Sequence, residues 1–290
     1  KINSLLLCDM KRKMIFVPAG GLANRIRATL SAIALAEQTG IELKVTWFRD
    51  WALHAAFRDL FVPGRLPEGV HIVEASVMDL LVYDRPRQKN FRVPALFQKV
   101  MFRACLYEHQ IDALRTQGFD FEEWVKQEGN VYMASYLPFY AYPDALLHEV
   151  FRPVPQVEEV IERRVSVFSA YTVGVHIRRT DNTLSIKHSP LELFFDCLDK
   201  EQAAHPDLCI YLATDSEEVK QAMRARYGER IVCAESKADR GSTAGIREGI
   251  ADLWTLARTR KIYGSFHSSF SELAAELGGI PLIVVKTENK

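Results

Sequence analysis

The chain has 290 residues, of which 48% are hydrophobic and 26% are charged, and its 37 basic residues balance its 37 acidic ones. This composition is typical of a globular protein and excludes the disordered and fibrous classes. A net charge of zero argues against a protein that binds nucleic acid over much of its surface, although it is compatible with a local basic pocket.

Cysteine usage and hydropathy narrow the class of protein further. The five cysteines are scattered and include no CxxC pair, so we expect neither a disulfide framework nor a zinc site. A reducing compartment is the simplest explanation of this cysteine usage. No apolar run reaches the roughly 18 residues that a membrane helix needs. We therefore expect a cytoplasmic protein in which residues 1–13 form a poorly ordered extension ahead of the first strand.

The first half of the chain begins with a strand, helix, strand pattern. Apolar residues recur at helical spacing between two short apolar runs, and strands that are joined in this way are parallel. The expected elements are a strand at 14–21, a helix at 22–40, strands at 41–48 and 130–136, and helices and loops across 63–130.

The second half alternates strands and helices regularly. The expected strands are 171–177, 208–213, 230–233, 261–264 and 281–285, and the expected helices are 156–168, 190–204, 216–227, 246–260 and 268–278. We therefore predict an α/β protein with two Rossmann-like, doubly wound domains at 14–155 and 156–290. Ligands of such folds bind at the carboxyl ends of the strands, here in a cleft between the two domains.

The stretch VGVHIRRTDN, residues 173–182, places four polar residues at the end of a buried strand. Strand alternation puts His176 and Arg178 on one face, and Gly174 leaves room there for a ligand or a close helix. Arg178 offers a planar fork of donors that suits a phosphate, and Asp181 could orient one of the two arginines. The alternative is a surface loop with an internal pair between an arginine and Asp181.

Other strand ends carry weaker signals. Asp215 or Ser216 is expected to cap the helix that follows them. Ser269 and Glu272 have the spacing of a capping box, although the same turn could bind an anion.

Near the N-terminus, AGGLANR places glycines between a strand and a helix, which is a weak signal for an anion site and does not match GxGxxG. The candidate residues of this loop are Gly20, Gly21, Asn24 and Arg25.

Taken together, these segments resemble the α1,6-fucosyltransferase and nodulation-fucosyltransferase group of the fucosyltransferase superfamily. The resemblance covers about residues 171–280. It rests on the order and spacing of VHIRRTDN, HSP, IYLATD, GIADLWTLART and SFHSSFSELAAEL, with GGLANR as a shorter motif near the N-terminus.

The resemblance implies a two-domain glycosyltransferase of the GT-B type, which inverts, uses GDP-fucose as donor and needs no metal ion. It also implies donor-side roles for four positions. Arg178 is similar to the arginine that binds the β-phosphate of the donor. His176 and Asp252 are similar to the pair that recognises guanine, and Ser268 is similar to a residue that contacts phosphate. Arg179, Asp181 and Ser269 are further donor-binding candidates. From helical periodicity alone, Asp252 is expected on the solvated face of its helix.

Two departures from the family pattern limit the prediction. The loop after the arginines has Asn182 where the α1,6 enzymes have a lysine, and it contains no glutamate to serve as catalytic base. The acceptor base, and with it the acceptor, is therefore not identified.

We accordingly expect a bacterial fucosyltransferase that acts on a glycan or lipid-linked glycan. The alternatives are a transferase that uses another nucleotide sugar and a binding protein without turnover.

Residues 85–107 mix aromatic and basic side chains. They could contact a membrane surface or a lipid-linked acceptor, but an ordinary solvated helix face explains the same composition.

Overall fold

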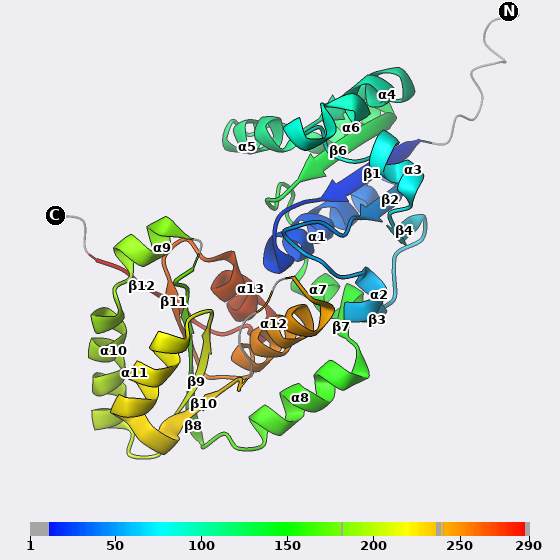
Figure 1. The fold of residues 1–290 in the computed structure, drawn as a ribbon. Coiled ribbons are helices and arrows are strands. Elements are labelled where there is room, and N and C mark those ends of the chain that lie inside the picture. The colour runs from blue at the N-terminus through cyan, green and yellow to red at the C-terminus, as the bar shows by residue number, and fades with distance from the viewer. Residues whose placement is uncertain (1–11, 181, 236–238, 240, 288–290) are drawn as a thin grey trace, which may run out of the picture. The chain divides into compact units, whose positions relative to one another are not determined.

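The computed structural model describes residues 12–180, 182–235, 239 and 241–287, and the chain divides into two compact units (Figure 1). The first unit comprises residues as far as Ala52, residues 56–58 and Pro63–Arg152. The second comprises residues 53–55, residues 59–62 and the chain from Pro153 onward, so two short segments of the first half belong to the second unit.

The first unit is built on a five-stranded sheet in which every recorded strand pairing is parallel, in the order β4-β2-β1-β6-β5. Its strands are β1 (Lys13–Pro18), β2 (Glu42–Trp47), β4 (Val70–Glu74), β5 (Ala104–Leu106) and β6 (Asn130–Ser135). Its helices are α1 (Leu22–Thr39), α3 (Val77–Val82), the 3-10 helix η1 (Gln88–Asn90), α4 (Val93–Met101), α5 (Glu108–Thr116), α6 (Phe121–Glu128) and α7 (Asp144–Val150).

Both faces of this sheet are covered, as is usual for parallel strands. On one face, Ile15 and Val17 of β1 pack in a cluster with Phe102. On the other face, the Phe16 ring lies 5.7 Å from that of Phe139, and Phe139 in turn contacts Phe121 of α6.

The second unit repeats this plan, with a sheet in the order β10-β9-β8-β11-β12 whose recorded pairings are also parallel. Its strands are β8 (Tyr171–Ile177), β9 (Leu208–Thr214), β10 (Ile231–Cys233), β11 (Ile262–Ser265) and β12 (Leu282–Val285). Its helices are α8 (Pro155–Val165), α9 (Thr183–His188), α10 (Leu191–Ala204), α11 (Glu217–Tyr227), the 3-10 helix η2 (Gly228–Arg230), α12 (Thr243–Leu256) and α13 (Ser269–Gly278). Three further short elements, α2 (Phe57–Leu60), β3 (Phe61–Pro63) and β7 (Phe151–Pro153), lie near the points where the chain passes from one unit to the other.

The central strand β8 shows the predicted alternation of faces. Val173, Val175 and Ile177 lie in a buried cluster with residues of α10 and α11. Gly174 faces the opposite side, because a Cβ atom on it would lie 2.9 Å from Cδ2 of Leu256 in α12. A close helix, and not a ligand, therefore requires the glycine at 174.

The α/β class and the two doubly wound sheets are confirmed, and several details of the prediction are corrected. Residues 63–130 contain two strands of the first sheet, β4 and β5, in addition to the helices and loops expected there. The expected extension at 1–13 lies mostly outside the described residues. It ends earlier than expected, because Lys13 begins β1 and the Arg12 carbonyl accepts a hydrogen bond from the Glu42 N–H.

Candidate functional site

The candidate site lies at the carboxyl ends of β8 and β11 in the second unit. These neighbouring strands pair in parallel, from Gly174 opposite Ile262 to His176 opposite Gly264. The connections that leave them run to opposite edges of the sheet, since β9 follows β8 and β12 follows β11. Such a switch point is where open α/β sheets bind ligands.

His176 is a buried histidine that is held by two serines of the α13 segment. Its Nδ1 lies 3.0 Å from Oγ of Ser271 and 3.2 Å from Oγ of Ser268. Its ring also lies 4.7 Å from the ring of Phe270. These contacts fix the orientation of the imidazole, so His176 is a preorganised part of the strand end.

Glycine at 264 makes this arrangement possible. A Cβ atom on Gly264 would lie 2.7 Å from both Cβ and Oγ of Ser271. The absence of a side chain therefore lets α13 approach β11 closely enough for Ser271 to reach His176.

Arg178 is the first residue beyond β8 and is half-buried. Its backbone N–H donates to Oγ of Ser265 at 3.2 Å, and the Ser265 hydroxyl donates to the carbonyl of His176 at 3.3 Å. Ser265 thus ties the end of β11 to the point where Arg178 leaves β8.

Arg179 has different surroundings from Arg178. Its guanidinium donates to the carbonyls of Arg178, at 3.1 Å, and Ser189, at 2.7 Å. Its backbone N–H donates to Asp215 at 2.7 Å, and burial lowers the pKa of its side chain. The partner expected for an arginine, Asp181, lies outside the described residues.

The loop after the arginines contains the short helix α9, which the sequence did not reveal. Asn182 caps this helix and donates from Nδ2 to the carbonyl of His267 at 2.8 Å. The Ser185 hydroxyl donates to the Phe266 carbonyl at 2.5 Å, and the Phe266 N–H donates to Oγ of Ser189 at 2.8 Å. These bonds fasten the loop to the turn between β11 and α13.

The turn at the start of α13 differs from the predicted capping box. Ser268, and not Ser269, is the N-cap, and its side chain makes no capping bond because its hydroxyl contacts His176. Ser269 is the first residue of the helix. Of the two capping candidates for α11, Ser216 accepts from the Val219 N–H, whereas Asp215 binds the backbone of Arg179 and Thr180.

Asp252 is not on a solvated face, contrary to the expectation from helical periodicity. Its Oδ1 accepts a hydrogen bond from the Tyr211 hydroxyl at 2.6 Å and from Arg164 at 3.1 Å. Burial raises the pKa of the Asp252 carboxyl, and the charge of Arg164 opposes that rise. The partners of Asp252 are thus different from the serines that hold His176.

In the first unit, the loop at Gly20 and Gly21 joins β1 to α1. Gly20 has a left-handed backbone with φ of 79°, and the Asn24 side chain lies over it, since a Cβ atom on Gly20 would be 3.2 Å from Nδ2. Gly21 is the N-cap of α1 and makes no side-chain capping bond.

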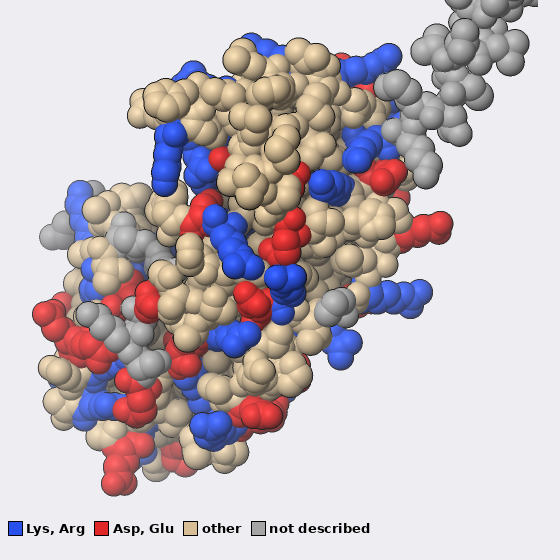
Figure 2. Space-filling model, turned by 45° about the vertical axis from the view of Figure 1, so that its right-hand side comes forward, with Lys and Arg blue, Asp and Glu red and all other residues tan. Residues whose placement is uncertain are grey.

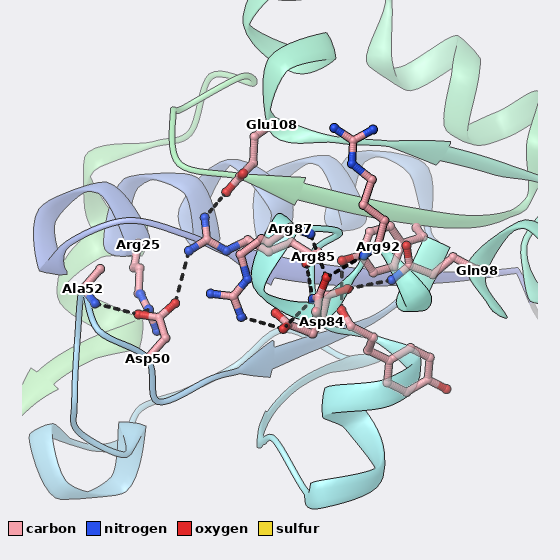
Figure 3. Close-up of polar contacts among 12 residues, drawn as sticks. Arg25, Asp50, Ala52, Asp84, Arg85, Arg87, Arg92, Gln98 and Glu108 are labelled. Carbon is pink, nitrogen blue, oxygen red and sulfur yellow. Dashed lines mark hydrogen bonds and ion pairs between the residues drawn. The ribbon is translucent and has the colours of Figure 1, made fainter. Parts of the chain in front are cut away.

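Arg25, the fourth candidate residue of this loop, is fully buried beneath it (Figure 3). Its guanidinium donates to the carbonyls of Gly20, at 2.9 Å, and Phe48, at 2.5 Å, and to Asp50 at 2.7 Å. Burial lowers the pKa of Arg25 to about 10, although Asp50 acts against it. Asp50 also pairs with Arg85, so the carboxylate joins two arginines.

Two further findings bear on the chemistry. Among the described residues, no three His, Cys, Asp or Glu side chains come together as metal ligands would. Within the same part of the chain, no helix is both long and apolar enough to span a bilayer.

Comparison with solved structures identifies proteins that have the same fold. The chain is similar to fucosyltransferase NodZ from Bradyrhizobium, with a TM-score of 0.66 and 18% identity over 95% of this chain and 96% of that one. It is also similar to Arabidopsis thaliana FUT1, with a TM-score of 0.66 and 14% identity over 95% and 71%, and to POFUT1, with a TM-score of 0.55 and 12% identity over 96% and 98%. The chain has the fold of these fucosyltransferases.

A crystal structure of NodZ α-1,6-fucosyltransferase soaked with GDP-fucose is also similar to this chain, with a TM-score of 0.66 and 17% identity over 94% of each chain. The sequence itself matches no known family profile, and no curated protein matches it either.

Proposed function

We propose that this protein is a glycosyltransferase that binds a GDP-sugar, with GDP-fucose as the first candidate, and transfers the sugar to a glycan hydroxyl. The observation that carries the proposal is the strand end at which Arg178 follows the buried His176 and the N-terminal turn of α13 lies beside them. The fold shared with fucosyltransferases that bind GDP or GDP-fucose supports the same assignment.

In this proposal Arg178 stabilises the leaving group. Departure of GDP builds negative charge on the β-phosphate, and a guanidinium held at a strand end can meet that charge as it forms. The backbone N–H groups of Ser269 and Phe270 at the start of α13 add partial positive charge, with the hydroxyls of Ser268 and Ser269 as further phosphate donors. Loss of one such contact typically lowers the rate by about 10²–10³.

We propose that His176 and Asp252 read guanine. Both recorded hydrogen bonds of Asp252 go to Oδ1, so Oδ2 can accept from the N–H groups of the base. The charge of Arg164 favours the ionised form of this carboxylate, and an ionised acceptor strengthens such hydrogen bonds. Asp252→Asn should therefore weaken binding of GDP more than it weakens binding of UDP.

We propose that transfer inverts the configuration at the anomeric carbon of the sugar and needs no metal ion, because the family resemblance implies both properties. We assign no acceptor base, because the loop that carries α9 contains no glutamate. Gly20, Gly21 and Asn24 are proposed as a phosphate or acceptor loop, and Arg25 as the residue that shapes it from below.

Calorimetry with GDP, ADP and UDP tests the donor assignment. We expect GDP to bind and the other two to bind at least tenfold more weakly (about 1.4 kcal/mol). If GDP does not bind at millimolar concentration while another diphosphate does, the donor assignment is wrong.

A second assay separates the sugar from the nucleotide. Slow hydrolysis of GDP-fucose, GDP-mannose and a UDP-sugar is followed by release of the nucleotide. Hydrolysis of GDP-fucose alone supports a fucosyltransferase, whereas hydrolysis of GDP-mannose alone indicates a transferase with another sugar. Tight binding of GDP-fucose with no hydrolysis and no transfer to any glycan would identify a binding protein and refute the enzyme.

A further inference from the structure

Helix α4 in the first unit is amphipathic in the reverse of the usual sense. Its inward residues are Pro94 and Gln98, and Gln98 is fully buried although it is polar. Apart from Lys99, its outward residues are apolar, with Leu96 67% exposed and Val100 88% exposed. A helix that only covered a core would bury the leucine and the valine and expose the glutamine.

The exposed apolar side chains extend beyond α4 onto its neighbour. Helix α3 packs against α4 and has no buried residue. We call the combined set the apolar patch, and its members are Val77, Met78, Leu80, Leu81, Phe91, Leu96, Phe97, Val100 and Met101. Extended exposed patches of this kind mark interaction surfaces in soluble proteins, whereas isolated exposed hydrophobic residues do not.

Phe91 is displayed by an unusual backbone. It is 88% exposed, and both Phe91 and Arg92 have positive φ, at 51° and 56°. Residues other than glycine adopt this conformation uncommonly, and it persists only where the surroundings enforce it. The enforcing contacts here are the hydrogen bonds from the Phe91 N–H to Gln88 and from the Arg92 N–H to Arg87.

A polar brace holds the segment between α3 and α4 in place (Figure 3). Nε2 of Gln98 donates to the carbonyls of Val82 and Asp84, at 3.1 and 2.9 Å. Asn90 donates to the Asp84 carboxylate at 3.0 Å, and Arg87 pairs with the same carboxylate. The buried glutamine and aspartate thus fix the turn that carries Phe91, so the patch is preorganised.

The charges around the patch have one sign. The exposed charged residues between 77 and 103 are Lys89, Arg92, Lys99 and Arg103, and all are basic. The two acidic residues of the segment are turned to partners within it, since the Asp79 carboxylate accepts hydrogen bonds from Ser76, the N-cap of α3, and Asp84 is buried in the brace. The upper part of the molecule in Figure 2, at the height of the α4 label in Figure 1, is mostly uncharged surface with basic residues near its margin.

We propose that the apolar patch and these four basic residues dock the first unit on the surface of an anionic lipid bilayer. Apolar side chains on a helix face can enter the boundary between headgroups and acyl chains, and neighbouring cations attract anionic headgroups. The charge complementarity selects an anionic bilayer over a neutral one. The inference does not depend on the proposed transferase reaction, because binding to lipid is measured without donor or acceptor.

Flotation with lipid vesicles tests the proposal. Vesicles of phosphatidylcholine that contain phosphatidylglycerol provide the anionic surface, and vesicles of pure phosphatidylcholine provide the neutral one. We expect the protein to float with the anionic vesicles and not with the neutral ones, and we expect added salt to weaken binding because it screens the basic residues.

Variants of exposed residues locate the contact without disturbing the fold. The triple variant Phe91→Ser, Leu96→Ser, Val100→Ser should lower vesicle affinity at least tenfold, and each of Lys89→Gln and Lys99→Gln should lower it about fivefold. A matched pair of variants provides the control. Val100→Glu places a charge in the patch and should abolish binding to vesicles, whereas Val167→Glu places the same charge at an exposed valine of the second unit and should leave binding unchanged. Melting temperatures of all variants should equal that of the unchanged protein.

Each of three results would overturn the proposal. The first is that the protein does not float with anionic vesicles, and the second is that it floats equally with neutral ones. The third is that Val167→Glu reduces binding as much as Val100→Glu. Light scattering provides one further outcome. If the protein is a dimer that the triple variant converts to a monomer, and vesicles do not bind it, the patch is an interface between two copies of the chain.

Discussion

Both units of this protein contain a five-stranded parallel sheet, and each has an arginine soon after its central strand, but the surroundings of the two arginines differ. Arg178 directly follows β8, whereas Arg25 lies in the first turn of α1, beyond the loop that leaves β1. Arg25 in the first unit is fully buried and is bonded to two carbonyls and to Asp50. Arg178 in the second unit is half-buried, and its backbone is held by Ser265. The partners of Arg25 thus give it a role in maintaining a loop, whereas Arg178 is the arginine that we propose to meet a ligand.

The largest effect on stability is expected from Arg25. Arg25→Ala removes the donor to two carbonyls and one of the two arginines that pair with Asp50, and breaking a buried ion pair costs about 3–5 kcal/mol. Urea denaturation followed by tryptophan fluorescence measures the loss, because Trp47 lies 5.3 Å from the Arg25 guanidinium.

Arg115→Ala is the matched control for this experiment. Arg115 pairs with Asp112 at 3.5 Å, and both side chains are exposed. Removal of such a pair should cost less than about 1 kcal/mol. Equal losses for Arg25→Ala and Arg115→Ala would contradict a structural role for the buried pair.

The next effect concerns ligand binding in the second unit. Arg178→Ala should abolish transfer and weaken GDP binding by about 2–3 kcal/mol, the scale of a hydrogen bond to a charged group. Arg178→Lys should restore little, because an ammonium cannot reproduce the bidentate fork. Calorimetry measures both affinities, and an unchanged melting temperature shows that the fold is intact.

Gly264→Ala tests the close approach of α13 to β11. The added methyl group would meet Ser271 at 2.7 Å and Cδ1 of Leu282 at 2.9 Å, and overpacking of this kind costs about 1–3 kcal/mol. We also expect weaker GDP binding, because Ser271 would no longer hold His176.

Gly249→Ala is the corresponding control within α12. A Cβ atom there has no described neighbour within 4 Å, so the substitution should stabilise the helix by about 0.5–1 kcal/mol. Thermal unfolding distinguishes the two variants by the sign of the change. A neutral Gly264→Ala would show that β11 and α13 are not packed as described.

The smallest effect is expected from Arg179. Arg179→Ala removes donors to the carbonyls of Arg178 and Ser189, so it should lower the free energy of unfolding by about 1–2 kcal/mol. It should reduce GDP affinity less than Arg178→Ala does. If Arg179→Ala loses GDP while Arg178→Ala retains it, the two adjacent arginines have been assigned to the wrong roles.

The strongly patterned elements could be predicted from the sequence, and the weakly patterned ones could not. Strand β8 and helix α1 are long and buried over most of their length, so their apolar signal is strong. Strands β4 and β5 are short, partly exposed and at the two edges of their sheet, which weakens the apolar signal that the prediction needs. Helix α9 has six residues, too few for a helical period to show.

The site was predictable as a strand end but not as a network. Strand alternation places His176 on the face opposite the valines, yet nothing local identifies Ser271, 95 residues later, as its partner. The burial of Arg25 did leave a signal, since Asp50 follows β2 just as the glycine loop follows β1. Parallel neighbouring strands bring such ends together, so an arginine and an aspartate after adjacent strands are candidates for a pair.

The assignment of Arg178 to the β-phosphate is tested most directly by comparing GDP with GMP. If Arg178 binds the β-phosphate, removing the arginine and removing that phosphate eliminate the same interaction, so the two changes are not additive. We predict by calorimetry that the unchanged protein binds GDP much more tightly than GMP, and that Arg178→Ala binds the two nucleotides almost equally. The same ratio of GDP to GMP affinity in both proteins would contradict the assignment.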